Sequence, residues 1–250
     1  MKRNIKLMIR YDGSRYFGWE HQPDREMTIQ GKIERVAAKM LGMPEGEIPE
    51  VIGAGRTDAG VHARAMVANI HADTDLSEDE ILEYLNRYLP DDIGVIRVVF
   101  ASERFHARYN ATGKCYMYRL YCGKSKPVFD RKYVTVLNEK PDVQAMKEAA
   151  QVLVGTHDFK SFCANARLKK STVRTVDLIN VVEKGDEIKL IFHGNGFLQN
   201  MVRIMVGTLL EAGYGRMSAQ DVARIMEEGD RKKAGPTAPP QGLCLMSVDY

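Results

Sequence analysis

The chain has 250 residues, of which 44% are hydrophobic and 28% are charged, as in a globular protein that can bury a substantial core. Because no stretch approaches the roughly 18 to 20 uninterrupted apolar residues that span a bilayer, we expect no membrane-spanning helix. The first residues run directly into a strand-like pattern without the long apolar core or cleavage site of a signal peptide. We therefore expect a cytoplasmic protein.

The cysteines and histidines do not have the spacing of a metal or redox site. None of the four cysteines forms a C-x-x-C pair, and the six histidines lack an H-E-x-x-H spacing. Cys115, Cys163 and Cys244 stand among apolar or aromatic neighbours, which predicts thiols packed in the core. We expect no metal.

Basic residues are unevenly distributed, although the net charge is only +3. Two acidic residues, Glu103 and Asp130, accompany eight basic ones between positions 102 and 132: Arg104, Arg108, Lys114, Arg119, Lys124, Lys126, Arg131 and Lys132. A second basic cluster consists of Arg167, Lys169, Lys170 and Arg174. Such surpluses, interleaved with tyrosine and phenylalanine, favour a surface that binds RNA phosphates and stacks bases. A solvated basic face is the alternative, and charge alone does not separate the two.

The first half of the chain alternates strand and helix patterns. The predicted elements are a strand over 6–11, a helix over 29–41 capped by Thr28, strands on both sides of a glycine-rich loop within 50–73, a helix after the Ser77–Glu80 capping box, and a strand over 93–100. Each boundary rests on a local signal, either a capping residue or a change of hydrophobic period.

The second half has a similar order of elements. It predicts a strand over 115–122, a helix over 143–154 opened by Asp142, a hairpin of 173–183 and 187–193, helices over 199–212 and 221–229, a loop over 232–241 and a strand over 242–250. The two β-α-β-α-β-like halves indicate an α+β fold, with an antiparallel or mixed sheet covered by helices.

Residues 53–63, Gly-Ala-Gly-Arg-Thr-Asp-Ala-Gly-Val-His-Ala, form the most informative segment. Its three glycines permit positive φ angles and close approach to a ligand, while Arg56 and Asp58 supply one cation and one carboxylate. A phosphate-binding loop is disfavoured, since the spacing fails G-x-G-x-x-G and a carboxylate would repel the anion. Asp58 taken alone fits a turn residue that bonds its own backbone.

This segment resembles the signature of the TruA family of tRNA pseudouridine synthases. The family's other motifs occur in the expected order from end to end: 11–13 with 17–22, Gln30, Phe105-His106-Ala107-Arg108, Lys114-Cys115-Tyr116-Met117-Tyr118, 157–162, 197–203 and Gly242-Leu243-Cys244-Leu245. Cys115 and Met117 depart from the more polar or basic residues of many relatives, which places one or two backbone contacts in doubt.

The resemblance implies an enzyme that isomerises uridine to pseudouridine at position 38, 39 or 40 of the tRNA anticodon stem-loop. It implies a pseudouridine synthase fold, with a curved, mostly antiparallel central sheet and flanking helices in two related halves. We place these halves at 1–107, which carries the Asp58 loop, and 108–250, which completes the cleft. The implied protein is a homodimer that binds the tRNA anticodon arm and uses neither cofactor nor metal.

Five residues match the functional positions of the family. Asp58 is the catalytic carboxylate, which either attacks the sugar, attacks the ring or acts through an eliminated glycal. Since a base inside a stem must be flipped out to react, Arg56 is expected to fill its place or hold the phosphate. Tyr116 lies against the target base and is a candidate for the later proton acceptor.

The other two matches concern the surroundings of the carboxylate. Arg203 lies in a run that is apolar on nearly every helical face, where an unpaired arginine would be costly. The resemblance places Arg203 beside Asp58, which it would keep ionised. Leu243, or alternatively Leu245, is expected beneath the base.

Two other functions compete with this interpretation. A tRNA-binding module without catalysis would share the basic segments but would not need Asp58. A nucleotide-dependent enzyme would bind a free nucleotide at roughly micromolar concentration. The glycine spacing disfavours the second alternative.

Overall fold

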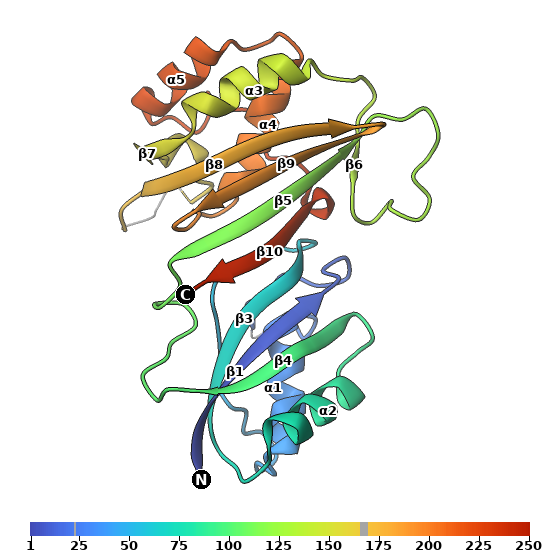
Figure 1. Cartoon of the computed structure of the whole chain (residues 1–250), viewed down its shortest axis with the longest axis vertical. Helices are drawn as coiled ribbons and strands as arrows, with labels where there is room; N and C mark the ends of the chain where they lie inside the picture. Colours follow the sequence, from blue (N-terminus) through green and yellow to red (C-terminus); the bar gives the residue numbers. More distant parts are fainter. Residues whose placement is uncertain (23, 166–169) are drawn as a thin grey trace. The chain divides into compact units, whose positions relative to one another are not determined.

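The computed structural model describes residues 1–22, 24–165 and 170–250. The chain divides into two compact units (Figure 1): Met1–Thr112 with Leu245–Tyr250, and Gly113–Cys244. The last strand, β10 (Leu243–Asp249), contributes its first two residues to the second unit and the others to the first. No helix among the described residues combines the length and the apolar character needed to cross a membrane.

The first unit is an antiparallel sheet with two helices. Its strands β1 (Lys2–Tyr11), β3 (His62–Asp73) and β4 (Ile93–Ala101) are arranged in the order β4-β1-β3, and the short β2 (Val51–Gly53) pairs with β3. On β1, the buried residues Ile5, Leu7 and Ile9 alternate with more exposed ones, so one face of the sheet carries the core.

The helices of the first unit begin where the capping residues predict. Helix α1 (Ile29–Met40) starts after Thr28, whose side chain accepts a hydrogen bond from the Gly31 amide. Helix α2 (Glu78–Tyr88) starts with the predicted capping box of Ser77 and Glu80.

The second unit has a four-stranded antiparallel path in the order β5-β9-β8-β7. These strands are β5 (Gly113–Tyr121), β9 (Glu187–Gly194), β8 (Val173–Lys184) and β7 (Gly155–Asp158). The two-residue strand β6 (Thr135–Val136) pairs with β5 and is parallel to it. A mostly antiparallel sheet was expected, and the described pairings confirm it.

Three helices pack on this sheet, and α3 contacts both of the others as well as β8 (Figure 1). They are α3 (Val143–Val152), α4 (Met201–Gly213) and α5 (Ala219–Glu228). Ten of the thirteen residues of α4 are buried, which confirms the prediction of a buried helix here. Short 3-10 helices cover Lys160–Phe162 and Pro240–Gly242.

The α+β class is confirmed, and the structure corrects several boundaries. Strand β1 starts at Lys2 rather than Lys6, because residues 2–5 also pair with β3. Helix α4 starts at Met201 because Asn200, with φ 59°, is left-handed. Helix α5 starts two residues before the predicted Asp221, because Ser218 caps it in a box with that residue.

Candidate active site

Asp58 lies in the loop that connects β2 to β3, which we call the Asp58 loop (residues 54–61). The amide of Ala54 donates to the Val67 carbonyl at 2.8 Å, so the loop leaves the sheet from a paired strand end. A turn closes it, since the Val61 amide donates to the Asp58 carbonyl at 3.1 Å and Gly60 takes a φ of 79°. Asp58 itself is half-buried at the start of this turn.

The residue before Asp58 is anchored on two sides. The side chain of Thr57 is buried, and its hydroxyl lies 2.8 Å from the hydroxyl of Tyr11 at the end of β1. Its carbonyl accepts a hydrogen bond from the Trp19 amide at 3.1 Å. Because both groups of Thr57 are bonded, the backbone that carries Asp58 has little freedom to move.

Residues 12–22, which we call the opening segment, run against the Asp58 loop. The Gly13 amide donates to Nδ1 of His62 at 3.0 Å, and Oδ1 of Asp12 lies 3.2 Å from the same nitrogen. A Cβ atom on Gly13 would lie 2.0 Å from the Val61 carbonyl oxygen. Gly18, with φ +98°, leaves no room for one either, because the Thr57 oxygen would be 2.5 Å away. These contacts explain why positions 13 and 18 of the opening segment are occupied by glycine.

Arg56 extends from the same loop to the surface. Its Nη1 donates to Oε2 of Glu20 in the opening segment at 3.0 Å, and both side chains are more than half exposed. An exposed ion pair of this kind contributes about 0–1 kcal/mol, so Arg56 can exchange Glu20 for another anion at little cost.

Tyr116, on β5 in the second unit, is buried beside a second aromatic ring. Its ring and that of Phe197 are 5.3 Å apart at 87°, an edge-to-face arrangement. Phe197 belongs to the predicted motif that leads into α4, so the structure brings two predicted motifs of this unit together.

Arg203 lies in the first turn of α4, and its guanidinium is hydrogen-bonded to a backbone carbonyl group before β10. Its Nε donates to the Ala238 carbonyl at 2.7 Å, and its Nη1 donates to Oδ1 of Asn200 at 3.1 Å. The Ala238 amide in turn donates to the Arg203 carbonyl at 3.1 Å. These bonds fix the direction of the guanidinium. Its predicted pairing with Asp58 stays a prediction.

Leu243 begins β10 and is buried, as is Leu245 two residues later. Both positions predicted as candidates beneath the base are therefore apolar and sheltered. The choice between them stays open.

Comparison with known proteins identifies the chain. A family model described as tRNA pseudouridine synthase matches residues 7–110 and 149–250. The chain is 47% identical over 248 residues to tRNA pseudouridine synthase A 1 of Clostridium tetani, covering 99% of this chain and 100% of that protein. It is 44% identical over 247 residues to tRNA pseudouridine synthase A 2 of Bacillus cereus, covering 99% of each. The chain belongs to the TruA family of tRNA pseudouridine synthases.

Among solved structures, one that matches this TruA-family chain does so at a much lower level. A chain of a Cbf5-Nop10-Gar1 complex is 14% identical, with a TM-score of 0.33. The match covers 99% of this chain and 58% of the other. A likeness this low does not bear on the fold or the activity.

The basic residues that were predicted to form an RNA-binding surface are not all exposed in this family member. Arg119 is an exception, and its assignment to that surface is wrong. Its guanidinium, 20% exposed, pairs with Glu187 at 2.6 Å and with Asp130 at 2.9 Å. Of the second basic cluster, Arg167 and Lys169 lie outside the described residues.

Three cysteines of this TruA-family chain were predicted to be packed in the core, and one of them is. Cys163 is buried, as predicted, whereas Cys115 and Cys244 are half-buried. The latter two stand on strands β5 and β10, where side chains alternate between the two faces of the sheet. Apolar neighbours in sequence therefore do not guarantee burial on a strand.

Tyr118 belongs to the tyrosines of the basic segment that were expected to stack bases, and its burial contradicts that expectation. It is fully buried, and its hydroxyl lies 2.6 Å from Oγ1 of Thr135 and donates to the Pro239 carbonyl at 2.7 Å. Burial raises the pKa of Tyr118 to about 12, against smaller opposite effects of Thr135 and the Arg203 charge. Tyr118 thus remains a neutral hydroxyl that holds the turn before Leu243.

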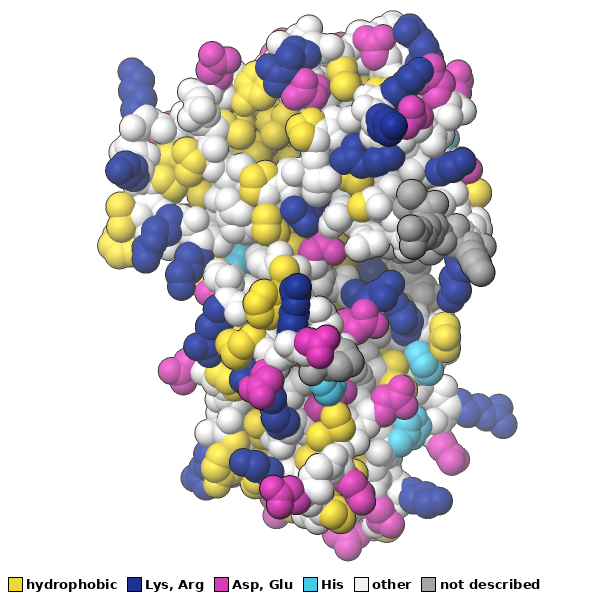
Figure 2. Space-filling model, turned by 180° about the vertical axis from the view of Figure 1, so that it is seen from behind, with side chains coloured by type: hydrophobic (Ala, Val, Ile, Leu, Met, Phe, Trp, Pro, Cys, Tyr) yellow, Lys and Arg dark blue, Asp and Glu magenta, His cyan; other side chains and the backbone are white. Residues whose placement is uncertain are grey.

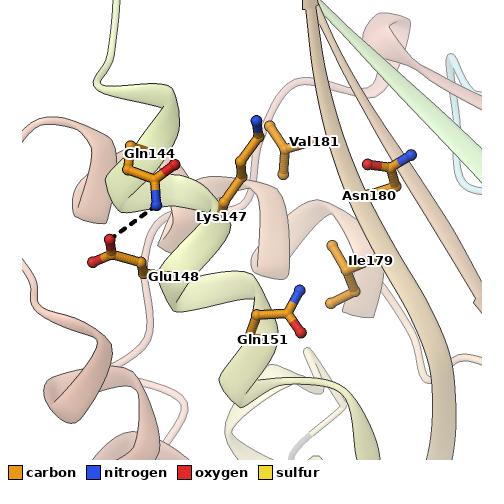
Figure 3. A pocket seen from close by; sticks show the side chains of 7 residues that line it. All are labelled: Gln144, Lys147, Glu148, Gln151, Ile179, Asn180 and Val181. Atoms are coloured by element: carbon orange, nitrogen blue, oxygen red, sulfur yellow. Dashed lines mark hydrogen bonds between the residues drawn. The ribbon is translucent and has the colours of Figure 1, made fainter.

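A hollow between α3 and β8 in the second unit is separate from the predicted site residues (Figure 3). It is lined by Gln144, Lys147, Glu148, Gln151, Ile179, Asn180 and Val181. In it, the Gln144 amide donates to the Glu148 carboxylate at 3.0 Å. None of the five residues expected from the TruA family lines this hollow.

Proposed function

We propose that this chain isomerises uridine to pseudouridine in the tRNA anticodon stem-loop, at one or more of positions 38, 39 and 40, with Asp58 as the catalytic carboxylate. The observation that carries the proposal is the construction of the Asp58 loop. A half-buried carboxylate stands directly after a residue whose hydroxyl and carbonyl are both bonded. Such a fixed carboxylate suits a reaction in which positive charge develops at a sugar carbon.

The reaction needs no external reagent. The N1–C1′ bond of uridine breaks, the base turns, and C5 forms a new bond to C1′. C5 loses its proton and N1 gains one, so the product is an isomer of the substrate. Asp58 either adds to C1′, adds to the ring, or assists removal of a sugar proton to give a glycal. Each route uses one ionised carboxylate.

Four further residues complete the proposed site. Arg56 releases Glu20 and either fills the place that the flipped base leaves or holds its phosphate. Tyr116 lies against the base, and Arg203 keeps Asp58 ionised and oriented. Leu243 packs beneath the base. The edge-to-face contact with Phe197 and the backbone bonds of Arg203 support these roles, since both side chains are held in defined positions.

We further propose that the protein is a cytoplasmic homodimer that binds the anticodon arm of tRNA. The support for this is the family resemblance together with the local surplus of basic residues. Sedimentation equilibrium of the purified chain, with and without tRNA, tests the dimer directly.

The experiment that tests the reaction maps pseudouridine by position in unmodified tRNA, without added cofactor. Wild type, Asp58→Asn and Asp91→Asn are compared, the last as a matched control because Asp91 is an exposed carboxylate of the same unit. We expect product at 38, 39 or 40 from wild type and control only, with tRNA binding of Asp58→Asn within about tenfold of wild type. Product at other positions would retain the chemistry and change the substrate.

The same experiment separates this proposal from a tRNA-binding module without catalysis. A binding module predicts tight tRNA binding and no pseudouridine from any of the three proteins. Equal loss of binding and turnover in Asp58→Asn would contradict the assigned catalytic role.

A further inference from the structure

A long loop connects β5 to β6, and we call it the β5–β6 loop (residues 122–134). It leaves β5 after Tyr121 and returns to pair beside the end of the same strand, with Leu120 opposite Thr135. Figure 1 shows this loop extending away from the sheet of the second unit. Nothing in the proposed reaction requires it.

The conformation of the β5–β6 loop is fixed by hydrogen bonds. Asp130, near its middle, accepts from Arg119 of β5 at 2.9 Å, and the Tyr133 amide donates to the Asp130 carbonyl at 2.7 Å. The Arg131 side chain donates to the Val128 carbonyl at 2.5 Å. A loop tied at several points presents its remaining side chains in a defined arrangement.

Apolar side chains are displayed at the tip of this loop. Phe129 is 93% exposed and the neighbouring Val128 is 56% exposed. Full burial of a phenylalanine side chain stabilises a folded protein by about 1.5–3 kcal/mol, and the exposed Phe129 does not provide this stabilisation. An aromatic ring held in water on a hydrogen-bonded loop indicates a binding surface.

The charge around Phe129 identifies the kind of partner. The β5–β6 loop contains four exposed basic residues: Lys124, Lys126, Arg131 and Lys132. Its one acidic residue, Asp130, is paired with Arg119. The face offered to a partner is therefore positive. The edge of the second unit that carries the loop shows Lys and Arg side chains next to exposed hydrophobic ones (Figure 2). An exposed ring among cations is the arrangement with which proteins stack unpaired bases and bind the flanking phosphates.

We infer that the β5–β6 loop binds the tRNA substrate, with Phe129 stacked on an unpaired base and the basic side chains at neighbouring phosphates. The inference rests on the proposed function. The stacked base is distinct from the target base. Tyr121, where the loop begins, is five residues along β5 from Tyr116, or roughly 17 Å at about 3.4 Å per residue.

The test measures the Kd for unmodified tRNA over a series of salt concentrations. We expect Phe129→Ala to raise Kd about fivefold or more without changing the slope of log Kd against log salt, since the ring carries no charge. Phe129→Trp should bind as wild type does. Leu178→Ala, which removes an exposed aliphatic side chain of β8 outside this loop, is the matched control and should have no effect. Lys126→Ala should weaken binding and reduce the slope by about one phosphate contact.

Two outcomes would overturn the inference. In the first, Phe129→Ala binds tRNA as tightly as wild type. In the second, Phe129→Ala sediments as a smaller species than wild type, which would assign the ring to an interface between copies of the chain. Because Phe129 is exposed, thermal unfolding of the variant should match wild type and exclude a folding defect. An absence of pseudouridine from the wild type would contradict the proposed function and leave the loop's binding role standing.

Discussion

Nδ1 of His21 lies 2.8 Å from Oε2 of Glu34, a carboxylate whose side chain is only 5% exposed. Gln30 bonds to both: its Nε2 donates to Oε1 of Glu34 at 2.9 Å, and its Oε1 accepts from the His21 amide at 2.8 Å. His21 follows Trp19 and Glu20 in the opening segment, and these two bond to the Asp58 loop. A buried carboxylate of α1 therefore fixes the segment on which the Asp58 loop rests.

Glu34 predicts a specific dependence of stability on pH. Burial raises the pKa of Glu34 above its usual 4.5, against smaller lowering effects of His21 and of its hydrogen bonds. The folded protein then holds this proton more tightly than the unfolded chain, so the contribution of Glu34 to the free energy of unfolding falls as pH rises from about 4.5 through the raised pKa. We expect the stability of wild type minus that of Glu34→Gln to decrease with pH across this window, as measured by urea unfolding.

Glu80 is a control with the opposite sign. The Ser77 backbone amide lowers the pKa of Glu80, because it bonds to the charged form. Its contribution is present above about pH 4.5 and is lost as pH falls through the lowered pKa. The difference between wild type and Glu80→Gln should therefore increase with pH. Parallel pH profiles for the two variants would contradict the argument about burial of Glu34.

The hydroxyl contact between Tyr11 and Thr57 should couple β1 to the Asp58 loop. Both residues are buried and their oxygens are 2.8 Å apart. In a double-mutant cycle of Tyr11→Phe and Thr57→Val, we expect a coupling of about 0.5–1.5 kcal/mol in the free energy of unfolding, with slower pseudouridine formation in each single variant. Tyr88→Phe, in an exposed residue, is the control. A coupling near zero would mean that this contact does not hold the loop.

The sequence predicts those parts of the fold that depend on local signals. Thr28, Ser77 and Asp142 cap their helices as expected, because a cap is a contact between residues two or three positions apart. The strands β6 and β7 were not predicted. Both are short, and they form only through pairing with β5 and β8, which an isolated four-residue pattern does not reveal.

The candidate site also has parts that local sequence signals predict and parts that depend on contacts between residues far apart in sequence. The glycine-rich loop around Asp58 stands out in the sequence, and the structure requires two of its glycines: Gly53 lies against the Trp19 ring and Gly60 has a positive φ. The roles of Tyr118 and Arg119 could not be found in this way. The hydroxyl of Tyr118 bonds to Pro239, and the guanidinium of Arg119 pairs with Glu187 on another strand. Partners this far apart in sequence become neighbours only after folding.

Gly207 cannot accept a side chain, because α4 packs closely against residues 236–238, which include the Ala238 carbonyl that binds Arg203. A Cβ atom there would lie 1.8 Å from the carbonyl oxygen of Pro236, which cannot move as a flexible side chain can. We expect Gly207→Ala to cost about 1–3 kcal/mol or more and to slow pseudouridine formation, since Ala238 then shifts away from Arg203. Gly94→Ala, whose Cβ would find its nearest atom at 3.5 Å, is the control. Wild-type unfolding and turnover in Gly207→Ala would contradict this packing.

Arg119 holds the β5–β6 loop through Asp130, near the middle of the loop, and its removal should release that loop. In Arg119→Ala, the Asp130 and Glu187 carboxylates lose their partner, which is four-fifths buried, so we expect a cost of about 1–3 kcal/mol in the free energy of unfolding. Once Asp130 has lost its partner, trypsin should cleave the native protein faster after the lysines and arginines of the β5–β6 loop. Mass spectrometry maps the cleavage sites. Arg216→Ala is the control. It breaks an equally short pair with Glu211, but the arginine is 56% exposed, so the loss of stability should be much smaller and the β5–β6 loop should stay uncut. If trypsin cleaved Arg119→Ala no faster than wild type, the loop would have to be held by its internal bonds alone.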